Sequence, residues 1–365
     1  MKDLIDEKQK EEPEMSPLQS RYEGEPMIGL ERATVIDTAG ASAVVPPGRS
    51  RNLGDMLFGG ALRSAVWIFL AILAGIIVVL VVQAMPSIQY SGLSFFTQEA
   101  WDPVNLRFGV APFIVDTLIV AAIAMILAST VGLATVIYLV EYAPRWLREP
   151  VAFLIELLAY IPSVVYGLWG LLVMAPWLQQ NLQPWIQQHL GFIPMFNGAP
   201  YGVGIMAASL ILSIMLMPLI VALSREALLL VPDSQREAML ALGATRWEVL
   251  RHSVLPYARG GIFGAITLSL GRALGETMAV AMTIGGGFQF PKTVYDQGYT
   301  LASIIANEFN EVSSDLYLSS LIEAGLILFV ITALVNVAGY FILQRMNRLH
   351  RVATTKPPRT RRAAV

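Results

Sequence analysis

The sequence predicts an all-α integral membrane protein with six transmembrane helices and both termini in the cytoplasm. Apolar residues make up 55% of the chain and charged residues only 14%, a balance that excludes an ordinary soluble domain. The charged residues are unevenly placed, because they leave long apolar stretches and gather in the loops between them. Basic residues are concentrated in alternate loops, which is the pattern that orients a multi-pass membrane protein.

Six stretches are long enough and apolar enough to cross a bilayer. Each approaches or exceeds the roughly 20 residues that span about 30 Å of hydrocarbon in helical conformation. They lie at residues 65–85, 113–139, 151–175, 202–223, 261–284 and 319–343. We expect a helix over each stretch, with a kink in the third, where Pro162 removes a backbone hydrogen bond.

The distribution of arginine and lysine sets the expected orientation. Basic residues follow the second, fourth and sixth stretches: Arg145 and Arg148; Arg225, Arg236, Arg246, Arg251 and Arg259; and Arg345, Arg348, Arg351, Lys356, Arg359, Arg361 and Arg362. The opposite loops contain only Arg107 and Lys292 as basic residues. By the positive-inside rule, the arginine-rich loops and both termini are cytoplasmic.

Two terminal segments differ in composition from the membrane domain, which we place at residues 61–347. Residues 1–32 hold nine acidic and five basic residues, a net charge of −4, and residues 33–50 are rich in Ala, Gly, Pro and Ser. We therefore expect residues 1–60 to form a disordered acidic cytoplasmic tail. Residues 348–365 form a basic cytoplasmic tail.

The sequence lacks the residues that an enzyme of the common classes needs. Cysteine is absent, so disulfides, thiolate metal sites and thiol nucleophiles are excluded. The three histidines, His189, His252 and His350, lie in separate loops. The chain also has no phosphate-binding G-x-x-x-x-G-K-[ST] loop. We expect no catalytic residue and no metal site, and any energy that the protein uses must come from a partner.

The loop at residues 233–256 is polar and is predicted to contain two short helices with a turn at Gly243, a residue that suits the left-handed end of a helix. Two pairs have the spacing of a capping box: Ser234 with Glu237, and Thr245 with Glu248. A helix on the membrane surface would not require two capped helices. A DNA-binding helix-turn-helix is disfavoured, because the loop is tethered between apolar stretches. We therefore expect a docking element.

The fifth apolar stretch carries two charged residues, Arg272 and Glu276, where membrane helices seldom have any. If this helix enters the membrane near Gly260, Arg272 lies about 18 Å along it, close to the midplane. Helical spacing would put Glu276 on the same face as Arg272. The same spacing would extend a polar stripe through Ser269 and Thr283.

Two explanations fit these charges. In the functional one, Arg272 compensates an anion that crosses the membrane, and Glu276 keeps binding weak enough for release. In the structural one, Arg272 forms a buried ion pair with Glu276, Glu156 or Glu323 that locks helices together. The next candidates for a substrate pathway are Ser269, Thr277 and Glu156.

Both segments resemble a known family. Glu237-Ala238-Met239, Gly243 and Leu255-Pro256 have the spacing of the E-A-A…G…I-x-L-P motif of bacterial ABC-importer permeases, with Met239 at the second alanine and Ser253 at the usual isoleucine. The string G-R-A-L-G-E-T-M-A-V at residues 271–280 is similar to that of phosphate ABC-importer permeases of the PstC type. The resemblance to this binding-protein-dependent transport permease family covers roughly residues 60–350.

The resemblance implies the type I ABC-importer permease fold and a role for the polar loop. In this family the loop docks in a groove of a cytoplasmic ATPase and couples ATP binding to movement of the membrane helices. The residues expected to act in this coupling are Arg236, Glu237, Ala238, Met239, Leu242, Gly243 and Ala244.

The resemblance further implies a subunit of an ATP-driven importer of inorganic phosphate in the cytoplasmic (inner) membrane. Its expected partners are a PstA-like sister permease, a PstB-like ATPase dimer, a PstS-like extracytoplasmic phosphate-binding protein and membrane lipids, with no nucleic acid. ATP and Mg²⁺ would bind to the ATPase, so this chain is expected to hold no cofactor. In this family the arginine and glutamate of the fifth-stretch string are regarded as part of the phosphate route, and they correspond to Arg272 and Glu276.

Two alternative functions remain open at this stage. The chain could be an ABC permease for another oxyanion or for phosphonates, because spacing alone does not distinguish phosphate from sulfate or molybdate. It could also be a secondary anion transporter driven by an ion gradient, with Glu276 as a proton carrier. The docking loop argues against the second alternative, since a secondary transporter needs no ATPase.

Overall fold

The computed structural model describes residues 53–354. The chain divides into two compact units, Met1–Trp67 and Ile68–Val365, and the first is described only from Leu53 onward. Most of the expected N-terminal tail lies outside the described residues. Residues 53–60, however, belong to a helix, so the boundary predicted at residue 60 was wrong. The last helix likewise continues to Thr354, beyond the predicted start of the basic tail at 348. The arginines of this segment, Arg345, Arg348 and Arg351, favour a helix interior.

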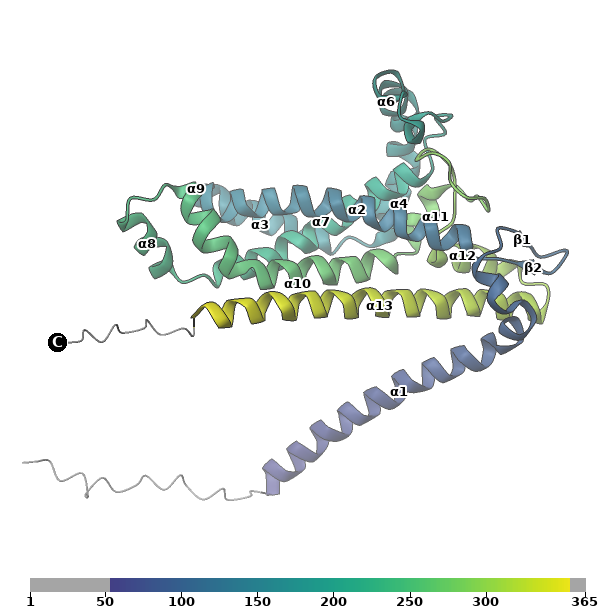
Figure 1. Cartoon of the computed structure of the whole chain (residues 1–365), viewed down its shortest axis with the longest axis horizontal. Coiled ribbons are helices and arrows are strands. Elements are labelled where there is room, and N and C mark those ends of the chain that lie inside the picture. The colour runs from purple at the N-terminus through teal and green to yellow at the C-terminus, as the bar shows by residue number, and fades with distance from the viewer. Residues whose placement is uncertain (1–52, 355–365) are drawn as a thin grey trace, which may run out of the picture. The chain divides into compact units, whose positions relative to one another are not determined.

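Helices make up nearly all of the described chain (Figure 1). The α-helices are α1 (Leu53–Ser91), α2 (Ala111–Ile137), α3 (Arg145–Ala159), α4 (Ser163–Trp169), α5 (Ala175–Trp177), α6 (Gln183–Leu190), α7 (Ile205–Leu229), α8 (Asp233–Ala241), α9 (Arg246–Val249), α10 (Leu255–Leu274), α11 (Met278–Ile284), α12 (Leu301–Glu308) and α13 (Asp315–Thr354).

Shorter helical turns continue or connect several of these helices. The π-helical turns are η3 (Tyr138–Tyr142), η4 (Gly170–Met174), η5 (Leu178–Leu182) and η7 (Leu250–Val254), and the 3₁₀ turns are η2 (Gly92–Phe96), η6 (Pro194–Phe196) and η8 (Phe309–Glu311). A two-stranded antiparallel hairpin, β1 (Trp101–Asp102) and β2 (Arg107–Phe108), was not predicted.

Four helical segments are long and apolar enough to cross a membrane: Met56–Phe96, Ala111–Tyr142, Ile205–Leu229 and Asp315–Arg345. A fifth is a bent pair, Arg145–Ala159 with Ser163–Leu190. The predicted all-helical membrane class is therefore confirmed. Two of the six predicted stretches, however, are interrupted rather than continuous.

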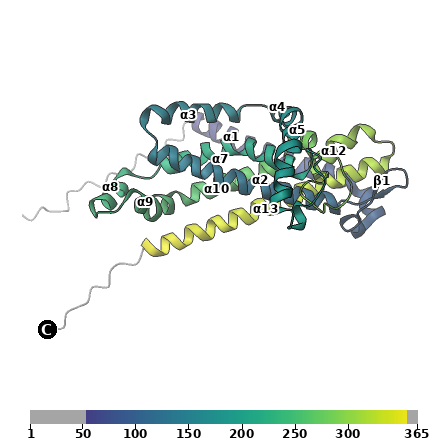
Figure 2. The ribbon, with the colours of Figure 1, turned by 90° about the horizontal axis from the view of Figure 1, so that it is seen from above.

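The third stretch is interrupted where a kink was expected. Helix α3 ends at Ala159, and Pro162 has the extended backbone (ψ 140°) of a residue that precedes a new helix. The two helical segments meet at 91°, and Pro162 favours the break because proline removes a helical hydrogen bond and disfavours helical conformation at the residue before it. Helix α3 consequently lies beside α7 instead of continuing into α4 (Figure 2).

The fifth stretch is interrupted without proline. Helix α10 ends at Leu274, and α11 begins at Met278. Gly275, the C-cap of α10, starts the break, and Gly285, with φ +92°, ends α11 in the left-handed conformation that favours glycine. The prediction of one continuous helix over residues 261–284 was therefore wrong.

Helix α7 lies at the centre of the packing, between α2 and α10 (Figure 1). Two thirds (67%) of its most apolar window is buried, against 0% for α1 and 11% for α13. Its side chains Ile211, Leu212, Leu216 and Ile220 are fully buried in the largest core cluster. The outer surfaces of α1 and α13 are apolar, as expected for helices covered by lipid or by another membrane subunit.

The two ends of the α2–α7–α10 bundle carry different elements. Both views place α8 and α9 at one end and α12 with the hairpin at the other (Figures 1 and 2). At the hairpin end, polar groups of α2 hold the segment before α12. The Asp116 carboxylate accepts the Tyr299 N–H at 3.2 Å, and the Thr117 hydroxyl accepts the Leu301 N–H at 2.9 Å. These bonds satisfy backbone donors that would otherwise be buried without partners.

The start of α7 provides a test of this packing. Gly204 has φ +143°, and an added Cβ would lie 2.5 Å from the Tyr295 carbonyl oxygen and 2.8 Å from that of Asp296. We expect Gly204→Ala to destabilise the protein by at least about 3 kcal/mol, through backbone strain and overlap. The measurement is the thermal unfolding midpoint of the purified protein in detergent.

Gly264→Ala is the matched control, because Gly264 lies inside α10 and an added Cβ there meets nothing within 4 Å. It should leave the midpoint unchanged or raise it slightly, since alanine favours a helix interior. Equal midpoints for the two variants would contradict the described start of α7.

Candidate functional site

The polar loop has the predicted helix–turn–helix shape, and its turn is built by backbone hydrogen bonds. Gly243 has φ +83° and follows Leu242, the C-cap of α8. Its N–H donates to the Leu240 carbonyl at 2.9 Å, and the Ala244 N–H donates to the Met239 carbonyl at 3.2 Å. This pair of bonds is a Schellman motif, in which glycine takes the left-handed position. The predicted left-handed turn at Gly243 is therefore confirmed.

Of the two predicted capping boxes, one is formed. The Thr245 hydroxyl accepts the Glu248 N–H at 3.4 Å, and the Glu248 carboxylate accepts the Thr245 N–H at 2.8 Å. Both the backbone and the hydroxyl of Thr245 donate to Glu248 and lower the pKa of its carboxyl. The box is therefore intact at neutral pH and weakens only as the pH falls through that lowered pKa.

The other predicted box, Ser234 with Glu237, is absent from the described loop. Helix α8 begins two residues earlier than the prediction requires, at Asp233, with Pro232 at its N-cap. Because Pro232 occupies the N-cap position, Ser234 lies inside the first turn of α8 and cannot cap it.

The faces of α8 differ from those expected. Met239 is half-buried and packs against the apolar cluster at this end of the bundle, whereas Glu237 and Ala238 are exposed. Leu242 is 84% exposed, and two apolar residues that sequence reasoning missed, Leu240 and Trp247, are also exposed. Their size was the only available signal in the sequence, because the helical phase of Leu240 depends on where α8 begins and that of Trp247 on where α9 begins. These side chains give the loop an outward apolar surface.

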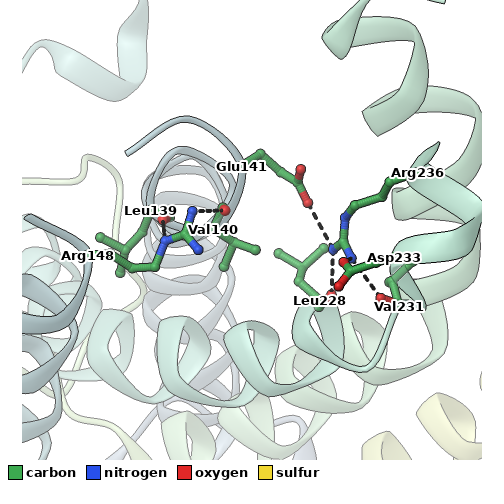
Figure 3. A network of polar contacts seen from close by, with 8 residues as sticks. All are labelled: Leu139, Val140, Glu141, Arg148, Leu228, Val231, Asp233 and Arg236. Atoms are coloured by element: carbon green, nitrogen blue, oxygen red, sulfur yellow. Dashed lines mark hydrogen bonds and ion pairs between the residues drawn. The ribbon is translucent and has the colours of Figure 1, made fainter. Parts of the chain in front are cut away.

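Arg236 points inward, toward the rest of the chain (Figure 3). Its Nη2 donates to Glu141 Oε1 and to the Leu228 carbonyl, each at 3.1 Å. Its Nη1 donates to the Val231 carbonyl at 2.7 Å and to Asp233 Oδ1 at 3.0 Å. The predicted outward contact of this side chain with a partner is therefore replaced by contacts within the chain.

A second arginine makes hydrogen bonds to backbone carbonyls in the same region (Figure 3). Arg148, in the first turn of α3, donates from Nε to the Leu139 carbonyl at 3.1 Å and from Nη2 to the Val140 carbonyl at 2.6 Å. Both carbonyls lie in η3, at the end of α2, where helical acceptors lack intrahelical donors. The guanidinium therefore caps α2 and fixes the direction in which α3 leaves it.

Arg272 lies in the last turn of α10, and its side chain is exposed. Within residues 53–354 it has no carboxylate at ion-pair distance. The end of a helix is a favourable place for an unpaired cation, because the last carbonyl groups carry partial negative charge. The predicted ion pair with Glu276, Glu156 or Glu323 is thus not formed.

The break after α10 separates the other predicted pathway residues. Glu276 Oε1 accepts the Ala279 N–H at 3.3 Å, so this carboxylate caps α11, and Thr277 lies beside it in the break. Ser269 and Thr283 are fully buried. The predicted polar stripe on one helix face was therefore wrong, because the helix does not continue past Leu274.

The two remaining candidate carboxylates lie elsewhere. Glu156 Oε1, on α3, lies 3.8 Å from Arg225 Nη1, on α7. Glu323 is buried on α13 and is 3% exposed. Glu156 thus contributes to the contact between α3 and α7, and the structure brings neither residue to Arg272.

Comparisons with known proteins agree with the helical arrangement and the polar loop described above. The family model described as "Binding-protein-dependent transport system inner membrane component" matches residues 133–348, which include the docking loop and Arg272. The chain belongs to this permease family. The family supplies the membrane component of transport systems and is not a family of enzymes.

Two curated relatives are similar over most of this permease. The "Phosphate transport system permease protein PstC" of Mesorhizobium japonicum is 41% identical over 81% of this chain and 91% of its own length. The protein of the same name from Haemophilus influenzae is 42% identical over 76% of this chain and 89% of its own.

A solved structure supports the fold alone. The bacterial alginate ABC transporter, in complex with an alginate-bound periplasmic protein, has a chain that matches 80% of this permease and 94% of its own length. The TM-score is 0.53 at 14% sequence identity.

The Schellman turn generates a prediction about the loop. An added Cβ at Gly243 would meet nothing within 4 Å, so the cost of Gly243→Ala comes from the φ of +83° alone. We expect it to destabilise the end of α8 by about 1–2 kcal/mol. The measurement is amide hydrogen exchange of residues 238–245, which should become correspondingly faster.

Gly243→Asn is the matched variant, because asparagine visits the left-handed conformation more readily than alanine. It should exchange at rates between those of the natural protein and Gly243→Ala. If alanine and asparagine were equivalent, backbone strain at Gly243 would not be the cause.

Proposed function

We propose that this chain is a permease subunit that passes inorganic phosphate across the cytoplasmic membrane as part of an ATP-driven importer. The observation that carries the proposal is the identity of 41–42%, over at least three quarters of the chain, with relatives named as phosphate transport permeases. The loop with its outward apolar surface supports the ATP-driven part, because a docking surface is what a separate ATPase requires.

Arg272 is proposed to bind the anion on its way through the membrane. An exposed guanidinium without an ion-pair partner among the described residues offers planar hydrogen bonds to phosphate oxygens and a charge that offsets their desolvation. Glu276, four residues along the chain and half-buried, would limit the affinity so that phosphate is released. Thr277 lies in the same break and is a further candidate for this pathway. Ser269 and Glu156 are not favoured, since one is buried and the other pairs with Arg225.

The proposed topology has six crossings with both termini in the cytoplasm. Four crossings are the long apolar segments, and the fifth is the bent pair α3 with α4–α6. The sixth is α10 with α11, interrupted at Gly275. Arg148, Arg236 and the other basic residues of the α8–α9 end support a cytoplasmic position for that end.

The proposed assembly contains four kinds of protein. A cytoplasmic ATPase dimer, which binds ATP and Mg²⁺, receives the outer surface of the loop, with Leu242, Leu240, Trp247 and Glu237 as contacts. A sister permease completes the pathway opposite the exposed face of α10. An extracytoplasmic phosphate-binding protein delivers the substrate at the hairpin end. The alginate transporter, which has a chain of this fold and was solved in complex with a periplasmic protein, supports this part of the proposal.

The test is uptake of radiolabelled phosphate into proteoliposomes that contain the complete complex, with and without internal ATP. We expect ATP-dependent uptake that excess unlabelled phosphate abolishes and sulfate or molybdate does not. Inhibition by another oxyanion or by a phosphonate would reassign the substrate. Uptake that ignores ATP and collapses on adding an uncoupler would identify a gradient-driven transporter.

Replacing Arg272 tests its proposed role. Arg272→Gln removes the charge that offsets phosphate desolvation and should reduce uptake on the order of 100-fold, as the loss of one anion-stabilising donor does in enzymes. Arg272→Lys, the matched variant, keeps the charge but not the planar donors and should retain part of the uptake. Size-exclusion chromatography should show intact complexes for both variants. Normal uptake by Arg272→Gln would remove Arg272 from the pathway.

A further inference from the structure

Helix α8 is attached to the rest of the chain along one face. Met239 supplies its apolar contact and Arg236, three residues earlier on the same face, its polar one. In the part of the chain that the structure describes, the side-chain hydrogen bonds and ion pairs that join α8 to α2 or to the end of α7 all belong to Arg236. The polar part of the contact between α8 and the end of α2 therefore depends on this one side chain.

The contacts of Arg236 cross between three segments of the chain (Figure 3). Glu141, in η3, is 95 residues away in sequence, the Leu228 carbonyl lies in the last turn of α7, and the Val231 carbonyl lies in the connection between α7 and α8. Both charged side chains are largely buried, with 19% of Arg236 and 18% of Glu141 exposed. Four hydrogen bonds use four of the five N–H donors of the planar guanidinium, which leaves it little capacity to bind a partner protein.

The chemistry of these contacts makes them strong. A hydrogen bond between two ionised, partly buried groups is shorter and stronger than a neutral one. The Leu228 carbonyl lies at the C-terminal end of α7, where a cation meets the negative end of the helix. That carbonyl also accepts the Val231 N–H at 3.3 Å, so removing Arg236 would leave chiefly Glu141 and the Val231 carbonyl without this donor, which is a larger loss than one surface ion pair.

We propose that the Arg236–Glu141 pair is a positioning contact that makes α8, the end of α7 and the end of α2 move as one body. The loop is already continuous with α10 through α9 and η7, so a displacement of α8 reaches α10 along the chain. The arginine contact adds a second route, to α2, and Arg148 extends it to the start of α3. The proposal rests on the proposed function in one respect, that α8 is the part displaced by an ATPase.

The first experiment uses the natural absence of cysteine from the chain. The double variant Arg236→Cys/Glu141→Cys, assembled with cysteine-free partners, should hydrolyse ATP while importing less phosphate. We expect the ATP consumed per phosphate to rise about tenfold, the size of a typical coupling between sites. Joining the two thiols with a short bifunctional reagent should restore the natural ratio.

The ratio separates positioning from simple instability, because fewer intact complexes would lower hydrolysis and uptake together. Asp233→Ala is the matched control: Asp233 also bonds Arg236, but it belongs to α8 itself and is 87% exposed. It should leave the ratio unchanged. A natural ratio in the double variant without the reagent, or a loss of uptake on cross-linking, would overturn the proposal.

A second measurement does not depend on the substrate. Spin labels at Ser234, exposed on α8, and Tyr142, exposed at the end of η3, report the separation of the two segments in the complete complex. Electron–electron distance measurements should give the same separation with and without ATP, and a broadened one in Arg236→Ala. An ATP-dependent change in the natural protein would refute the proposal even if phosphate proved to be the wrong substrate.

Discussion

Burial of α7 between α2 and α10 is the constraint on which the rest of the structure depends. Its apolar side chains fill the largest core cluster, and both functional regions are defined by the helices that touch it. The docking loop follows directly from its C-terminal end, and α10, which carries Arg272, packs along its length. In a bilayer the lipid offers no gain for burying apolar side chains, so close packing of these helices and satisfied polar groups must hold the bundle together.

Most of the chemistry lies where helices end, because helix ends expose backbone groups that need partners. Gly243 ends α8 with a Schellman turn, and Thr245 and Glu248 cap α9. After the break between α10 and α11, Glu276 caps α11, and before the break Arg272 lies in the last turn of α10. For the same reason, Asp116 and Thr117 lie beside the segment that leads into α12 and accept backbone N–H groups that would otherwise be unpaired.

Two arginines illustrate how the surroundings of one residue type decide its role. Arg236 donates four hydrogen bonds to groups of its own chain and is largely buried, so it holds segments in fixed relative positions. Arg272 is exposed and pairs with no carboxylate of the described residues, which leaves its donors available to an anion. The proposed mechanical role and the proposed binding role thus fall on different arginines within one membrane domain.

The sequence by itself determined the helical membrane class, the apolar cores of most spans and the docking loop with its turn at Gly243, because these follow from local composition and backbone preference. It placed Arg272 in the fifth stretch but missed the end of α10, and it assigned Arg236 to a partner. The kink at Pro162 was predicted, but only the tertiary structure decided that it is a 91° turn, that α10 breaks at Gly275 and which groups pair with Arg236. The last of these features depends on Glu141, 95 residues away in sequence, whose proximity no local pattern records, since packing around α7 creates it.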